Sequence, residues 1–338
     1  MGFERAEIAA GDVLLFHGKS FVSWAIRTID GTQVNHVAIA LPNGMLAEAG
    51  GKGLQSRSIP LPGGGEYILV NRFKGGHPIQ PVVDRANVLL NEGRLYAYQQ
   101  IVLLAVLCLT RRIPLPRLAR RMVRSALDHA AKAVMDLLPV GASWMICSAY
   151  VYRAYHEAIE GDTDVYEPQF AGISFAPGEP RLLDWSLEHA GDVTVAPAMT
   201  FGPADVPADP AMRAATIEAD LAPLVIEYAK GLYDEGLISE ADLPPIVDPS
   251  FGPPPLLPPE PTDEELLASV AKFSIAYASA QGVMPPPDPA FSAVGSVIAA
   301  AALKGALEGL KKLEVEGNFV TPGDFLRSPS YERMGRLG

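Results

Sequence analysis

The first quarter of the chain restricts the fold more than any other feature, because four β-rich runs follow one another there. The runs are DVLLF, HVAIAL, MLAEA and YILVNRF, and all lie within residues 11–73. Glycine, proline and asparagine separate them, as in the turn PNG at 42–44, and residues of this kind favour tight connections between strands. Helical patterns follow only later. The sequence therefore predicts an α+β fold, with a small antiparallel sheet and packed helices.

The expected helices are read from apolar residues at helical spacing. This spacing extends over residues 84–137, and another helix is expected to start near Cys147. Thr262 and Glu265 have the spacing of a capping box, which marks a helix start. The remaining helices are expected at 211–236, 263–280 and 291–312. The last segment, NFVTPGDFLRSPSYERMGRL, has a strand and turn pattern.

The composition changes after residue 160. Up to that point 17 basic and 12 acidic side chains give a net charge of +5, whereas 10 basic and 27 acidic side chains give −17 in the remainder. The later part is also rich in proline, and residues 243–261 read LPPIVDPSFGPPPLLPPEP. Proline lacks the N–H donor and fixes φ, so such a segment neither propagates a helix nor occupies a central strand. We expect linkers or arms that wrap over a surface.

The overall charge and the cysteine usage exclude several classes of protein. A net charge of −12 argues against nucleic acid as the general partner, because phosphates bind to basic surfaces. The N-terminus MGFERAEIAAGD lacks the pattern of a secretory signal, so the expected location is cytoplasmic. Delivery by a phage or as an effector is the alternative, because it would leave the same pattern. The two cysteines, Cys108 and Cys147, form no C-x-x-C pair, and the histidines show no metal-ligand spacing. We expect neither a metal nor a cofactor.

Cys147 stands at the start of an amphipathic pattern, SWMICSAYVYRAY. The positive end of a helix dipole favours a thiolate, and the backbone N–H of the same residue points where an oxyanion forms. A cysteine among apolar residues is, taken alone, more often part of the core. Cys108, inside LLAVLCLT, is expected to be such a core residue.

His36 and Glu48 are the candidate partners of Cys147. His36 precedes the alternating run VAIAL, and Glu48 follows twelve positions later. A thiol is a weak nucleophile until an imidazole takes its proton, and the imidazole works best when its other nitrogen donates to a fixed acceptor. The alternatives are that His36 packs beside a strand and that Glu48 is a solvated carboxylate.

Together these segments resemble the NlpC-type papain-like cysteine hydrolases. Those enzymes carry a CSG helix, then a GDLVFF strand, then HVGIY and a third polar residue about a dozen positions later. Here GDVLLF (11–16), NHVAIAL (35–41) and LAEA (46–49) come first, and ICSAYVYRAY (146–155) comes last. This order resembles the circularly permuted branch, which contains lecithin:retinol acyltransferase-like and YiiX-like proteins. The resemblance implies Cys147 as nucleophile, His36 as general base and Glu48 as the group that orients the imidazole, although many relatives have histidine at the third place.

The resemblance also implies a division of the chain. The closing VTPGDFLRSP is similar to the terminal segment of YiiX-like proteins. Residues 1–160 would form the permuted papain-like catalytic core, 161–316 an acidic, Pro-rich helical insertion, and 317–338 a segment that returns to the core. The expected activity is a cysteine hydrolase or acyltransferase that acts on an amide, ester or thioester of an acyl-bearing peptide or lipid, through an acyl-enzyme.

Two alternatives remain open at this point. Instead of an enzyme, the chain could be an inactive papain-like binding module. It could also be a structural or assembly protein that uses the insertion for protein contacts and oligomer formation. A basic helix face leaves a second choice open, because Arg117, Arg120, Arg121 and Arg124 recur at i, i+3, i+4 and i+7. These arginines would contact an anionic membrane peripherally, or dock the acidic helices of residues 161–316.

Overall fold

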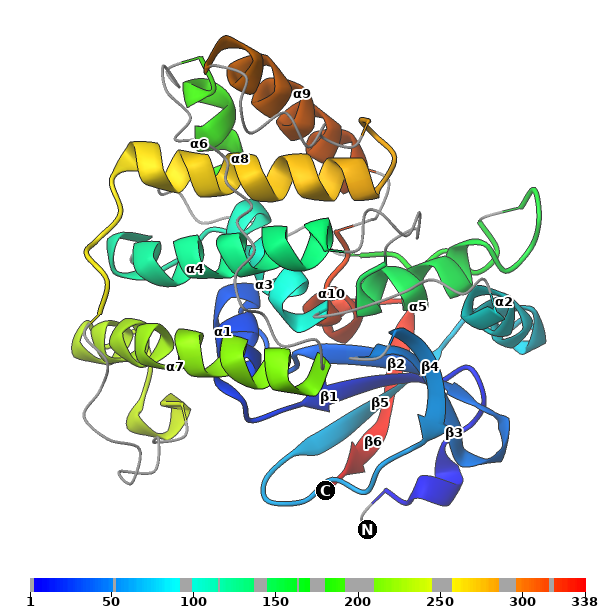
Figure 1. Cartoon of the computed structure of the whole chain (residues 1–338). Coiled ribbons are helices and arrows are strands. Elements are labelled where there is room, and N and C mark those ends of the chain that lie inside the picture. The colour runs from blue at the N-terminus through cyan, green and yellow to red at the C-terminus, as the bar shows by residue number, and fades with distance from the viewer. Residues whose placement is uncertain are drawn as a thin grey trace.

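The protein, a computed structural model, combines one antiparallel sheet with helices stacked above one of its faces (Figure 1). The structure describes residues 3–50, 53–91, 99–114, 116–136, 145–162, 164–170, 180–191, 210–244, 257–285, 296–315 and 319–338. The sequence-based prediction of an α+β fold is thereby confirmed.

The sheet contains six strands in the order β4-β3-β2-β1-β5-β6, and every neighbouring pair is antiparallel. All four runs read from the sequence form strands. The run GLQSRS was not predicted but forms a further strand, since its polar residues hide the alternation. The strands are β1 (Val13–His17), β2 (His36–Leu41), β3 (Met45–Gly50), β4 (Gly53–Ser58), β5 (Tyr67–Phe73) and β6 (Tyr331–Leu337).

Apolar side chains lie on both faces of the sheet, since successive residues of a strand point to opposite faces and several strands are apolar at consecutive positions. Val13 and Leu15 of β1 point into the large core shared with the helices, and neither is exposed. Leu14 lies in a smaller cluster with residues of β2, β3, β5 and β6. Phe3 and Ile8 of the N-terminal segment pack against this second cluster. The N-terminal segment thus covers the face that the helices leave open.

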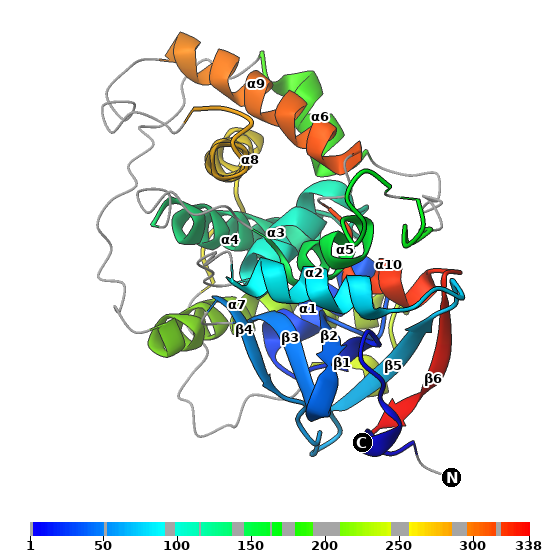
Figure 2. The same cartoon turned by 90° about the vertical axis from the view of Figure 1, so that its right-hand side faces the viewer.

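The helices form successive layers above the sheet (Figure 2). Helix α5 contacts β2 and β3, α3 packs between α1 and α4, and α8 lies between α4 and α9. The helices are α1 (Phe21–Asp30), α2 (Gln80–Asn91), α3 (Gln99–Thr110), α4 (Pro116–Met135), α5 (Cys147–His156), α6 (Leu182–His189), α7 (Pro210–Asp234), α8 (Asp263–Ala280), α9 (Ser296–Val315) and α10 (Pro322–Arg327).

The three predicted late helices correspond to α7, α8 and α9, although 291–295 of the predicted range lies outside the described residues. The predicted capping box is present, since Thr262 accepts from the Glu265 N–H at 3.2 Å and Glu265 accepts from the Thr262 N–H at 3.0 Å. The helical region expected over 84–137 is divided into α2, α3 and α4, while residues 92–98, 115 and 137 lie outside the described residues.

The C-terminal segment differs from the strand and turn pattern expected of it. Its first part forms α10, which Thr321 caps by accepting from the Asp324 N–H at 3.2 Å, with Pro322 at the first helical position. Both are start signals of a helix. Strand β6 follows and pairs with β5 along the edge of the sheet.

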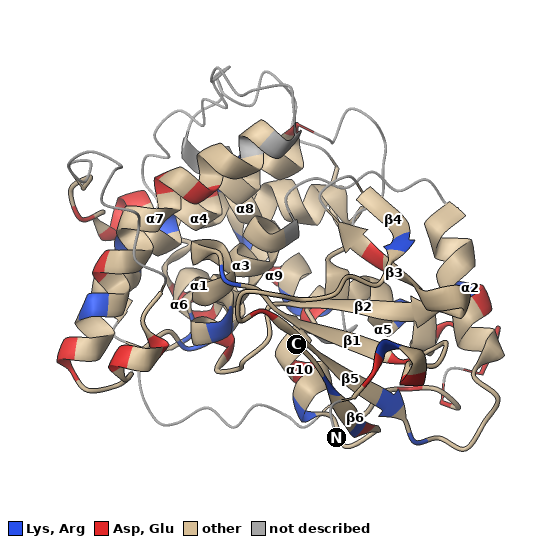
Figure 3. Ribbon diagram, turned by 90° about the horizontal axis from the view of Figure 1, so that it is seen from below, with Lys and Arg blue, Asp and Glu red and all other residues tan. Residues whose placement is uncertain are grey.

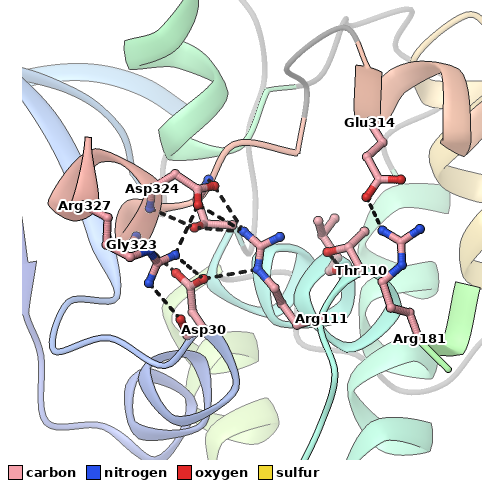
Figure 4. A network of polar contacts seen from close by, with 10 residues as sticks. Asp30, Thr110, Arg111, Arg181, Glu314, Gly323, Asp324 and Arg327 are labelled. Carbon is pink, nitrogen blue, oxygen red and sulfur yellow. Dashed lines mark hydrogen bonds and ion pairs between the residues drawn. The ribbon is translucent and has the colours of Figure 1, made fainter. Parts of the chain in front are cut away.

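Buried charges hold α10 against the C-terminal ends of α1 and α3 (Figure 4). The Arg111 guanidinium donates to Asp30 Oδ1 at 3.3 Å and to Asp324 Oδ2 at 3.1 Å. Asp30 Oδ2 also accepts from the Gly323 N–H at 3.1 Å, and Arg327 donates to Oδ1 of Asp30 at 3.3 Å. The Asp30 side chain is fully buried. Segments about 290 positions apart are joined by this network.

The arginine-rich face of α4 meets the acidic helices of the later chain, where acidic residues recur along α7 (Figure 3). Arg121 pairs with Glu227 at 2.7 Å, and Arg124 pairs with Glu265 at 3.2 Å. Arg120 pairs with Asp263 at 2.5 Å. These contacts are the docking that the sequence left open, while membrane contact through Arg117 and its neighbours stays a prediction.

Candidate active site

The structure brings the three predicted site residues together at one end of the sheet. Cys147 is the first residue of α5, and His36 is the first residue of β2. Glu48 lies in the second half of β3. Because α5 packs on β2 and β3, the start of the helix reaches the start of β2. Three short local patterns, far apart in the sequence, therefore converge.

His36 and Glu48 form a hydrogen-bonded pair between adjacent strands. Their Nε2 and Oε2 atoms are 2.9 Å apart. A carboxylate only accepts, so Nε2 carries the proton and donates it. The two side chains are 12% and 4% exposed, respectively. Since Nε2 is occupied, Nδ1 is the imidazole nitrogen left for another partner.

That partner is Cys147, whose side chain hydrogen-bonds to the imidazole. Burial lowers the pKa of His36, but the charge and hydrogen bond of Cys147, together with those of Glu48, outweigh it and raise the pKa to about 10. A raised pKa means that the protonated imidazole is stabilised between two acidic neighbours. The surroundings of His36 therefore favour its protonated form.

Glu48 is itself held by two residues of β4 that the sequence did not point to. Arg57 donates to both carboxylate oxygens, at 2.6 Å to Oε1 and 3.1 Å to Oε2, and Gln55 Nε2 donates to Oε1 at 2.9 Å. Burial alone would raise the pKa of Glu48, yet His36 and Arg57 lower it well below its usual range. The carboxylate therefore stays ionised and fixed in orientation.

The signal for Arg57 and Gln55 was present but ambiguous. Both alternate with serines in the polar run GLQSRS, which reads equally well as a surface loop. Only the register shows their position, because Glu48 stands opposite Gln55 in the β3–β4 ladder. Gly50 completes the arrangement, since a Cβ atom there would lie 2.1 Å from Gln55 Nε2.

The start of α5 offers donors beside the thiol. The first N–H groups of a helix have no acceptor within it. Ile146 precedes α5 in an extended conformation and contributes no side-chain cap. Donors at this positive helix end are placed where negative charge would develop on a group attacked by Cys147. Cys147 and Cys108 are both buried. Cys108 lies within α3, where burial raises the pKa of its thiol.

Within the ranges that the structure describes, no three His, Cys, Asp or Glu side chains are grouped to hold a metal ion. None of the helices in these ranges combines the length and hydropathy that crossing a membrane requires. Comparisons of the chain with protein-family models, curated proteins and solved structures found no match. The geometry around Cys147 is therefore the main guide to function.

Proposed function

We propose that the protein is a cysteine hydrolase or acyltransferase in which Cys147 is the nucleophile, His36 the general base and Glu48 the orienting group. The observation that carries this proposal is the position of the imidazole, between a thiol at a helix start and a buried carboxylate with two supports of its own. A histidine that merely packed beside a strand would need neither neighbour. The permuted papain-like order of the same segments supports the assignment.

The reaction would proceed in two balanced steps. The Cys147 thiolate attacks an acyl carbonyl, and donors at the start of α5 hold the oxyanion. The bond to the leaving group then breaks as His36 gives its proton to the departing amine, alcohol or thiol, which leaves a thioester on Cys147. In the second step His36 takes a proton from water or an acceptor, whose oxygen, nitrogen or sulfur attacks the thioester and releases the acyl group.

Glu48 would act in both steps without touching the substrate. Its bond to Nε2 fixes the tautomer and leaves Nδ1 toward the sulfur, while its charge stabilises the imidazolium formed in each cycle. The substrate class that follows is an acyl compound with an amide, ester or thioester bond. A buried thiol that lacks this activation would instead indicate an inactive module whose insertion carries the function.

The test is the pH dependence of Cys147 alkylation by iodoacetamide, with Cys108→Ser as the background. We expect alkylation at pH 6 to be much faster than for an ordinary thiol, and to lose this advantage in His36→Ala. Labelling of the unfolded protein gives the rate of an unactivated thiol. Labelling only at high pH, or with no dependence on His36, would overturn the proposal.

A further inference from the structure

A second polar cluster surrounds Tyr67 at the β5–β6 side of the sheet, and Cys147 and Glu48 do not belong to it. Tyr67 begins β5, between β1 and β6 in the sheet. His17 and Arg336 contact its ring. The charges of Arg27 and Arg333 act on Tyr67, and that of Lys19 acts on His17. We name this group the Tyr67 cluster, and its basic members are His17, Lys19, Arg27, Arg333 and Arg336.

The Tyr67 ring is the centre of this cluster. The His17 ring stacks on it with centroids 4.3 Å apart and planes at 12°. The guanidinium carbon of Arg336 lies 4.0 Å from the same centroid. The Tyr67 hydroxyl donates to Gln33 Oε1 at 2.8 Å. Neighbouring strands thus place one cationic group and one ionisable imidazole on either side of a single aromatic ring.

The cations of the cluster make hydrogen bonds with neutral or main-chain oxygens. Arg27 donates to the Gly18 carbonyl and Lys19 to the Gly64 carbonyl. Arg333 Nε donates to Asn71 Oδ1 at 2.5 Å, and Arg336 Nε donates to a main-chain oxygen of Gly338 at 2.9 Å. Among the described residues no Asp or Glu side chain forms an ion pair with any of these four cations.

The electrostatic consequences agree with this geometry. Burial lowers the pKa of His17, and the charges of Arg27, Arg336 and Lys19 lower it further. Burial also lowers the pKa of Arg27 and of Arg333, and no carboxylate offsets this. Elsewhere in the fold arginines such as Arg111 and Arg121 face carboxylates. Within the described ranges, four cations that share no Asp or Glu partner stand out in a chain whose net charge is −12.

We propose that the Tyr67 cluster is a binding site for a phosphate group. Guanidinium groups present paired N–H donors that match phosphate oxygens, and several cations around one point favour a dianion over a single carboxylate. The site also borders the start of β2, because the Gly18 N–H donates to Asn35 Oδ1 at 2.6 Å and Asn35 precedes His36. The inference does not depend on the proposed acyl chemistry, since binding requires no activated thiol.

The test is calorimetric titration of Cys147→Ser protein with inorganic phosphate, against chloride at equal ionic strength. We expect the dissociation constant for phosphate to rise at least about 10-fold in the double variant Arg333→Gln/Arg336→Gln, because charge-assisted hydrogen bonds are lost. Both residues are on the edge strand, so folding is expected to survive. Arg117→Gln, an exposed arginine of α4 outside the cluster, is the matched control and is expected to bind like the parent protein.

Two arms distinguish the source of the phosphate. The first arm is co-sedimentation with phosphatidylcholine vesicles that contain phosphatidic acid. If the parent protein sediments with these vesicles and the double variant does not, the site binds a lipid-borne phosphate. Binding of inorganic phosphate without vesicle retention assigns it to a small molecule. The proposal is overturned if phosphate binds no better than chloride, or if the double variant and Arg117→Gln bind it equally. Neither result alters the alkylation test of Cys147.

Discussion

Replacing Glu48 by glutamine tests the electrostatic coupling at the candidate site most directly. The substitution keeps the size of a side chain that is 4% exposed but removes its charge. Two unit charges about 4 Å apart interact by about 4 kcal/mol at an effective dielectric constant near 20. That energy corresponds to about 3 pKa units. The amide introduced at position 48 still accepts one hydrogen bond, which offsets part of this change. We therefore expect the pKa of His36 to fall by at least about 2 units.

The assay is a pH titration by NMR of protein labelled with carbon-13 at the histidine ring. The chain has six histidines, and loss of one signal in His36→Gln assigns the relevant resonance. In the parent protein this resonance is expected to titrate near pH 10. In Glu48→Gln it is expected to titrate at about pH 8 or below.

The matched control is Glu167→Gln, which removes the carboxylate paired with His156 further along α5. This variant should leave the titration of His36 unchanged. Thermal unfolding of both variants checks that each is folded. A His36 resonance that still titrates near pH 10 in Glu48→Gln, or that moves as far in the control, would refute the reasoning.

Further predictions follow from the contacts described above. The pKa of His36 is raised from 6.5 to about 10, so the stability that its protonated form contributes is complete below pH 6.5 and is lost as the pH rises toward 10. In urea unfolding, the free energy of unfolding of the parent protein should fall by on the order of 3 kcal/mol between pH 6 and pH 10, and this fall should be absent in His36→Gln. Equal falls in the two proteins would contradict this. Asp30→Asn removes the charge of a fully buried side chain shared by Arg111 and Arg327 and should lower the free energy of unfolding by about 3 kcal/mol. Asp263→Asn removes the charge of an ion pair whose carboxylate is 76% exposed and should lower the free energy of unfolding by less than about 1 kcal/mol. If urea titrations gave similar losses for Asp30→Asn and Asp263→Asn, the distinction between buried and exposed ion pairs would be contradicted. Gly50→Ala displaces Gln55 from Glu48 and should cost about 1 kcal/mol and slow Cys147 alkylation at pH 6 a few-fold, so an unchanged alkylation rate would remove Gln55 from the site.

Local patterns were sufficient for β1, β2, β3 and β5, and the resemblance of the order of the motifs to a known family pointed to the three residues that meet at the candidate site. Alternation in HVAIAL and MLAEA identifies β2 and β3, and the spacing from His36 to Glu48 spans the short turn between them. Arg57 was not foreseen, because its role depends on which strand pairs with β3 and in which register. The helical start signals around Thr321 were present, but the segment was interpreted as strand and turn, which concealed them.

The Tyr67 cluster was beyond the reach of sequence reasoning for a different reason. His17 and Arg336 are far apart in the chain and become neighbours of one ring only because β6 adds to the edge of β5. No periodicity records that pairing. Likewise the arginines of α4 fit either a bilayer or an acidic partner until the contacts of α7 and α8 are known.

The distance in sequence between β5 and β6 has a consequence for how the protein is made. Arg333 and Asn71, which meet across these strands, are 262 positions apart. At about 5–20 residues per second, a ribosome needs roughly 15–50 s to synthesise the intervening chain. During that interval β5 presents unpaired N–H and C=O groups along an open edge, which is a template for association with other nascent chains. Chains released before β6 should therefore aggregate, and nascent chains should depend on chaperones until the last strand is added.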